Sequence, residues 1–270
     1  QIKIEAEKGK ITGEFDFEKY GNILWTIDGS FMISYSSENN EFVTYKHPTI
    51  SNTKIPQDYF SYFNLMNSLD ENHYEISGSN PSLHTFEESI MLTENINKVF
   101  DKLSNSYKEF INLFINVLML KKINDDKYFF KSVTDNTHIN RVIICNGHTV
   151  SDEILVEALI HEATHGLLTI IDVFNKWQPS NQKSDHFGRK IHSPWTNNLL
   201  TIRNLVQGIY VWYGLYNFWN SKPLNFNQEY AKERAIFIKK GFLNLDINLY
   251  KEMLSPLTFS ELSSIKNKFI

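Results

Sequence analysis

Residues 154–171 form an apolar run that contains the pattern His-Glu-Ala-Thr-His at positions 161–165. Hydrophobic residues recur there at helical spacing and Ser151 precedes them as an N-cap residue, so the run predicts a buried helix. Residues four apart share a helix face, so His161 and His165 can direct their imidazoles at one metal ion. Glu162 lies about 100° round the axis, within reach of a metal-bound water. The pattern predicts a half-built metal site on a core helix.

The composition limits the classes of partner. The chain has 270 residues, of which 41% are hydrophobic, and a net charge of −4. This is long enough for one large domain, or for one domain with a subdomain. Charges of both signs are interspersed without a basic stripe, so we expect no nucleic-acid partner. The apolar runs are short or broken by polar residues, so we also expect no membrane partner.

The single cysteine and the first residue bear on the cellular compartment. One cysteine, Cys145, excludes an internal disulfide and a cysteine-based zinc cluster, which favours a reducing compartment. No signal-peptide pattern is present, and the sequence starts at Gln1 in place of Met. We expect a cytoplasmic protein whose natural N-terminus lies upstream of Gln1.

Patterning predicts a β-rich and loop segment over residues 1–84 and a helical catalytic domain over 85–270. In the first segment we expect strands at 10–17, 22–27 and 30–35, loops over 36–85, and a short helix at 57–67. In the second segment we expect the elements that follow, in chain order: helices at 86–100 and 105–123, strands at 128–133 and 139–145, the motif helix, a polar loop at 175–190 that could act as a lid, and helices at 198–220, 228–239, 243–254 and 260–269. Gly241 is expected to be a hinge between two of these helices. The fold class is mainly α with a small β-sheet (α+β), with the motif helix packed against further long helices.

A second group of residues follows the motif helix. Ser193-Pro194-Trp195 precedes a long aromatic-rich helix. That helix carries Arg203, Gln207 and Tyr210 at positions i, i+4 and i+7, so the three side chains share one face.

These two motifs, in this order and spacing, resemble the HExxH-type peptide β-hydroxylases of modified-peptide natural product biosynthesis, over residues 85–270. The resemblance implies an oxygenase that depends on iron(II) and 2-oxoglutarate and hydroxylates a side-chain β-carbon of a ribosomally made precursor peptide. It implies His161 and His165 as metal ligands, with Glu162 and Arg203 as catalytic residues. Ser193, Trp195, Arg203 and Tyr210 would shape the cofactor pocket.

This chain departs from the family pattern at two positions. Gln207 stands where the family has a histidine, and it is the candidate third metal ligand, although an amide oxygen binds metal more weakly than imidazole. Thr196 stands where the family commonly has an arginine, and Arg203 could supply the fork that a carboxylate prefers.

Two other classes remain open. In a zincin-type metallopeptidase, His161 and His165 would bind zinc and Glu162 would take the proton from the bound water. The metzincin continuation is absent, because Leu168 and Ile171 occupy its glycine and final histidine positions. The third class is a metal-free peptide-binding protein, in which the histidines are hydrogen-bonded core residues.

Overall fold

The computed structural model describes residues 3–5, 10–12, 23–25, 31–36, 41–46, 57–58, 86–122, 130–134, 141–174, 177 and 190–270. The chain forms two compact units, one of residues 1–98 and 115–150 and the other of residues 99–114 and 151–270. The predicted boundary between residues 84 and 85 lies outside the described residues. The predicted fold class, mainly α with a small sheet, is confirmed.

The first unit contains most of the strands. β1 (Lys3–Glu5) pairs with β2 (Lys10–Thr12), and a three-stranded antiparallel sheet joins β3 (Ile23–Trp25), β4 (Phe31–Ser36) and β5 (Glu41–Lys46). The strands predicted at 22–27 and 30–35 are confirmed and pair with each other, with Leu24 of β3 opposite Ile33 of β4. β5 lies within the segment that we predicted as loops, so that prediction is wrong over its residues. Residues 57–58, where we predicted the start of a helix, form the strand β6 (Gln57–Asp58); the rest of that predicted helix lies outside the described residues.

A four-stranded sheet in the same unit has the order β6, β7 (Val117–Lys121), β9 (Arg141–Cys145) and β8 (Lys131–Thr134). The prediction of one helix over 105–123 is wrong, because the helix ends at Phe114 and β7 follows. β7 runs parallel to β6 and β9, and Val117, Leu118 and Leu120 are almost completely buried. A strand in the middle of a parallel sheet is apolar on both faces, and in sequence it resembles a continuation of the preceding helix.

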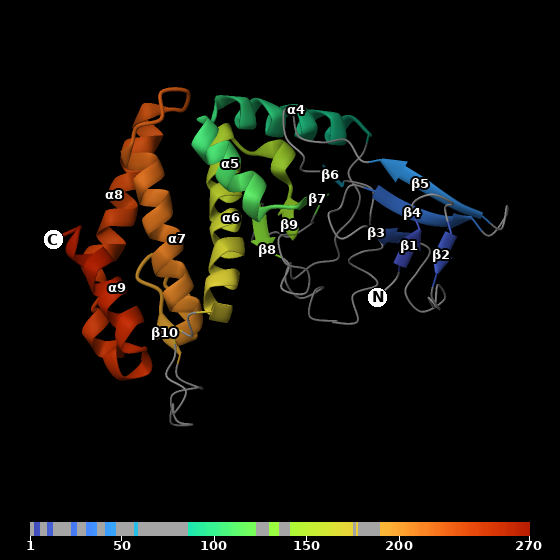
Figure 1. Cartoon of the computed structure of the whole chain (residues 1–270). Helices are drawn as coiled ribbons and strands as arrows, with labels where there is room; N and C mark the ends of the chain where they lie inside the picture. The colour runs from blue at the N-terminus through green and yellow to red at the C-terminus, as the bar shows by residue number, and fades with distance from the viewer. Residues whose placement is uncertain are drawn as a thin grey trace. The chain divides into compact units, whose positions relative to one another are not determined.

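Helices dominate the second unit, where α5 (Asn105–Phe114) packs on α6 (Asp152–Phe174), α6 on α7 (Ile202–Asn220), and α7 on α8 (Gln228–Asn244) (Figure 1). The 3₁₀ helix η3 (Ile247–Met253) and α9 (Pro256–Asn267) close the chain, and α9 contacts α7. The helix α4 (Phe86–Lys102) crosses from the first unit into the second. The helix that we predicted at 243–254 is mostly the 3₁₀ helix η3.

The start of each later helix follows from its capping residue. The side chains of Thr201, Asn227 and Ser255 accept hydrogen bonds from backbone N–H groups in the first turns of α7, α8 and α9. Such caps satisfy donors that have no partner inside the helix. Pro256 then occupies the first turn of α9, where its missing N–H costs nothing.

Gly241 is not a hinge, because α8 runs through it from Gln228 to Asn244. The indole of Trp195 lies directly against its α-carbon. A β-carbon added at Gly241 would lie 2.0 Å from Nε1 and 2.1 Å from Cδ1 of that indole. The residue is glycine because Trp195 packs against the helix backbone there.

Helix α6 has the length and apolar composition of a membrane-spanning helix, a test that core helices of soluble proteins also pass. More than half of its most apolar window is buried inside the structure. The expectation of no membrane partner and the cytoplasmic location both stay predictions.

Candidate metal centre

The two motif histidines lie side by side on α6. The Nε2 atoms of His161 and His165 are 3.2 Å apart, and their ring centroids are 4.9 Å apart. Two imidazole nitrogens that bind one ion at about 2.1 Å, with an angle between 90° and 110°, lie roughly 3.0–3.4 Å apart. The separation in this structure fits shared coordination of one metal ion.

The other two predicted members of the centre also lie beside His165. The side chain of Gln207, from α7, hydrogen-bonds to His165, and the Glu162 carboxylate is close enough to act on it electrostatically. Glu162 is 2% exposed. A buried carboxylate beside a histidine pair is costly unless charge or hydrogen bonds compensate it.

Burial and neighbouring charge keep His165 neutral. Desolvation and the proximity of His161 lower the pKa of His165 to about 4, while Glu162 and Gln207 act in the opposite direction. A neutral imidazole has the lone pair that a metal ion requires. Among the described residues no group of three His, Cys, Asp or Glu side chains converges, so a third protein ligand there would have to be of another type, such as Gln207.

Helices α6 and α7 run antiparallel and meet through a series of side-chain contacts. As the residue number rises along α6, it falls along α7. The pairs are Glu157 with Trp219, His161 with Trp212, His165 with Gln207, and Asp172 with Arg203. The histidine pair thus occupies the middle of this series.

The sequence matches no family model and no curated protein. The resemblance to peptide β-hydroxylases therefore stays a prediction.

The structure places Ser193 and Trp195 in a hairpin loop between β10 (Ile191–His192) and β11 (Leu199–Leu200). The Ser193 hydroxyl accepts hydrogen bonds from the backbone N–H groups of Trp195 and Thr196. Trp195 is 8% exposed, and its Nε1 donates to the carbonyl of Ile238 at 2.9 Å. Both residues are engaged within the fold, and their predicted part in a cofactor pocket stays untested.

Arg203 and Tyr210 are also engaged. Arg203 Nε donates to Asp172 Oδ2 at 2.6 Å, although the arginine side chain is half-exposed. The Tyr210 hydroxyl donates to Glu261 Oε2 of α9 at 2.7 Å. Burial and the Glu261 carboxylate raise the pKa of Tyr210 well above its ordinary value. A 2-oxoglutarate carboxylate that used Arg203 would have to share it with Asp172 or displace that residue.

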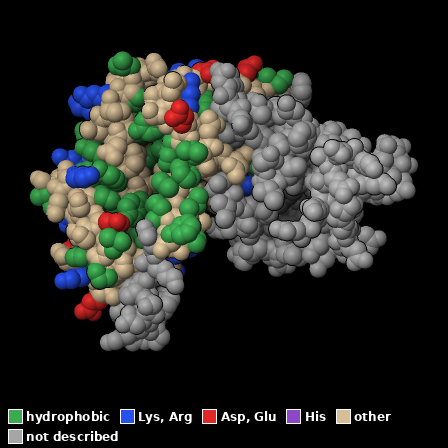
Figure 2. Space-filling view, viewed as in Figure 1, with side chains coloured by type: hydrophobic (Ala, Val, Ile, Leu, Met, Phe, Trp, Pro, Cys, Tyr) green, Lys and Arg blue, Asp and Glu red, His purple; other side chains and the backbone are tan. Residues whose placement is uncertain are grey.

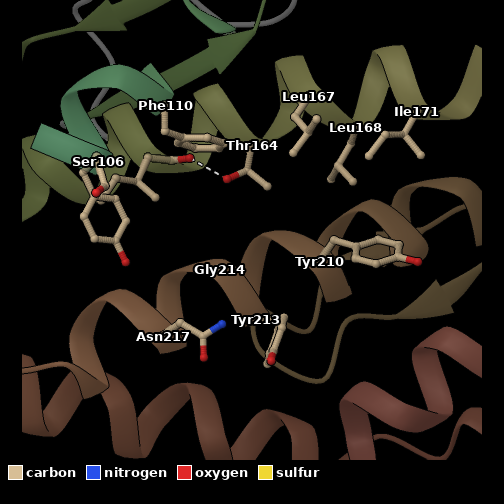
Figure 3. Close-up of a pocket in the computed structure, with 12 residues that line it drawn as sticks. Ser106, Phe110, Thr164, Leu167, Leu168, Ile171, Tyr210, Tyr213, Gly214 and Asn217 are labelled. Carbon is tan, nitrogen blue, oxygen red and sulfur yellow. Dashed lines mark hydrogen bonds between the residues drawn. The ribbon is translucent and has the colours of Figure 1, made fainter. Parts of the chain in front are cut away.

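An apolar pocket of about 370 Å³ opens between α5, α6 and α7. Figure 3 shows Leu167, Leu168 and Ile171 of α6 facing Tyr210 of α7, while Asn217 lies towards the other end. Hydrophobic side chains gather around α5, α6 and α7 in Figure 2. Neither histidine lines the pocket, but the neighbours of His165 along α6 do.

Three residues that the sequence analysis passed over also belong to this region. Glu157 precedes His161 by one turn and binds Arg234 of α8, with Nε–Oε2 and Nε–Oε1 distances of 2.8 and 3.0 Å. The ring of Trp212 meets that of His161 edge to face, with centroids 6.4 Å apart. The four-residue spacing from Glu157 to His161 to His165 places all three on one helix face, and it was the one sequence pattern that could have pointed to Glu157. Nothing in the sequence pointed to Arg234.

Proposed function

We propose that this chain is an iron(II)- and 2-oxoglutarate-dependent oxygenase that hydroxylates a side-chain β-carbon of a ribosomally made precursor peptide. The observation that supports it best is the 3.2 Å separation of the His161 and His165 Nε2 atoms, with the Gln207 side chain on His165. Two imidazoles and an amide oxygen on one ion leave coordination positions for a 2-oxo acid and for oxygen. The reaction class and the peptide substrate come from the resemblance of the two motifs.

In this proposal each residue has a defined task. His161 and His165 hold the metal as neutral imidazoles, and Gln207 either completes the ligand set or orients His165 by hydrogen bonding. Glu162 supplies a negative charge that partly offsets that of the metal ion. When iron(II) and 2-oxoglutarate are bound, they supply the oxygen-activating chemistry.

The apolar pocket supports a peptide substrate with an apolar side chain. Its walls are mostly aliphatic and aromatic, from three helices. Such pockets favour apolar groups, and the few polar atoms at their edges set orientation. Asn217 and Ser106 are two of the polar side chains in the lining that could contact a peptide backbone.

A zinc-dependent metallopeptidase is the second candidate, because buried Glu162 follows His161 directly and could take a proton from a metal-bound water. That chemistry usually has three protein ligands from His, Asp, Glu or Cys. In the described part of the chain no three such side chains converge to hold one metal ion. The oxygenase therefore has the stronger support.

The deciding experiment is an anaerobic titration of metal-free protein with iron(II) and 2-oxoglutarate, followed by visible spectroscopy. The oxygenase predicts a metal-to-ligand charge-transfer band that appears only when both are present. His161→Ala should abolish the band and most metal binding, while the far-ultraviolet circular dichroism stays unchanged. His192→Ala is the matched control, since this exposed histidine lies in the β10–β11 hairpin and should leave the band intact.

Other outcomes would redirect the assignment. Tight zinc binding without the band, together with cleavage of a peptide into two fragments, would support the metallopeptidase. If neither metal binds stoichiometrically, the proposal is wrong and the metal-free peptide-binding protein becomes the better reading.

A further inference from the structure

A stack of aromatic rings connects the β10–β11 hairpin to the histidine pair. The indoles of Trp195 and Trp212 are stacked, with centroids 5.8 Å apart and an interplanar angle of 22°. The edge-to-face contact of Trp212 with His161 continues this stack. Both tryptophans are less than 10% exposed. Aromatic pairs at such distances favour defined relative orientations, so the stack restricts the ring of His161.

Arg234 packs against Trp212. Its guanidinium carbon is 5.1 Å from the centroid of the Trp212 ring and 4.6 Å from that of Phe237. A cation over an indole face is attracted to the electrons of the ring. Trp212 therefore contacts both a stacked indole and a guanidinium.

Glu157 fixes the guanidinium in turn. Both of its carboxylate oxygens accept from Arg234, and Oε2 also accepts from Trp219 Nε1 at 2.8 Å. Burial disfavours the charge of Arg234, but the hydrogen bonds and charge of Glu157 outweigh it and raise the pKa of the guanidinium. Glu157 lies one helical turn before His161. Helix α6 therefore carries both Glu157, which binds Arg234, and His161, whose ring contacts Trp212.

We propose that Trp212, held by Trp195 and by the Glu157–Arg234 ion pair, is a positioning residue that fixes the ring of His161 for metal binding. This inference rests on the proposed function, because it takes His161 as a metal ligand. Histidine ligands are commonly oriented by a hydrogen bond to their second ring nitrogen. Here edge-to-face packing with an indole fulfils that role.

The test uses cobalt(II) as a spectroscopic metal with the 270-residue chain. Trp212→Leu should weaken cobalt(II) binding by roughly tenfold, the lower end for the loss of a group that orients a ligand, and should alter the ligand-field bands. Phe218→Leu is the matched control. It removes a buried aromatic ring from the same helix, and among the described residues the ring contacts of Phe218 are with Tyr107, Trp219 and Phe226. None of them is with His161, Trp212 or Arg234. Cobalt(II) affinity and bands should stay as in the unaltered protein even though thermal stability falls.

Arg234→Lys provides a milder second variant in case Trp212→Leu does not fold. It keeps the positive charge but loses the planar, two-pronged contact with Glu157. Its cobalt(II) affinity should therefore lie between that of the unaltered protein and that of Trp212→Leu. A metal-free readout is the nuclear Overhauser contact between the His161 and Trp212 rings, which should weaken in Arg234→Lys and persist in Phe218→Leu.

The outcomes separate this inference from the proposed function. If the unaltered protein does not bind cobalt(II), the metal centre itself is wrong. If it binds, but Trp212→Leu and Arg234→Lys keep its affinity and bands, the positioning role is wrong and the centre stands. Equal spectral changes in Phe218→Leu would also overturn the positioning role, because general loosening of the core would then explain them.

Discussion

Gly241→Ala should destabilise the protein although alanine is the better helix former. In an unobstructed helix interior the exchange gains at most about 1 kcal/mol. At Gly241 the new methyl group would overlap the indole of Trp195, with a closest approach of 2.0 Å. Overpacking of a core costs roughly 1–3 kcal/mol, and displacement of the indole also puts at risk the hydrogen bond to Ile238, worth about 1 kcal/mol. The net loss in the free energy of unfolding should be about 1–3 kcal/mol.

Gly208→Ala is the matched control, because no atom lies within 4 Å of its added β-carbon outside the local helix backbone. It should stabilise the protein by about 0.5–1 kcal/mol. Thermal unfolding followed by circular dichroism should therefore move in opposite directions for the two variants, by roughly 2–4 °C per kcal/mol. Equal midpoints would refute the argument from packing. Trp195→Leu combined with Gly241→Ala should recover part of the loss, since the two residues are in direct contact.

Two further predictions concern α7. The hydrogen bond from Lys268 lowers the pKa of Tyr213 below its ordinary value of 10.0, whereas burial and Glu261 raise that of Tyr210. In a pH titration, Tyr213→Phe should therefore show less phenolate absorbance than the unaltered protein already below pH 10. Tyr210→Phe should show less only above pH 10. Because the folded-state pKa of Tyr213 is depressed, its contribution to stability should be present above pH 10 and decline as pH falls through that pKa; identical titration curves would contradict both directions. If Arg203 anchors 2-oxoglutarate, Arg203→Gln should raise the dissociation constant measured calorimetrically, and Asp172→Asn, which removes the competing carboxylate, should lower it; unchanged binding in both would remove Arg203 from the site.

Local patterns were enough to predict most of the long helices and the spacing of the histidine pair. The positions of His161 and His165 follow from a four-residue spacing on one helix, which depends only on the helical period. Long-range packing determined what the sequence could not reveal. β7 resembled a helix extension because the side chains on both of its faces are apolar and buried. Gly241 resembled a hinge because its role is determined by Trp195, far earlier in the chain.

The contribution of Arg234 was hidden for the same reason. Its partner Glu157 lies 77 positions earlier, on another helix. In sequence it is one charged residue among several on α8, most of them exposed. Only the packing of α8 against α7 identifies it as the residue that holds Trp212.

The antiparallel contacts between α6 and α7 also limit how this chain could change length during evolution. One residue added within either helix would turn everything beyond it by about 100° about the helix axis and separate partners that now meet. After an insertion between His161 and His165, for example, the ring contact of His161 with Trp212 could be kept only if the hydrogen bond between His165 and Gln207 were lost. Descendants of the same ancestral gene should therefore carry their insertions and deletions outside residues 157–172 and 203–219, however far their other residues have diverged.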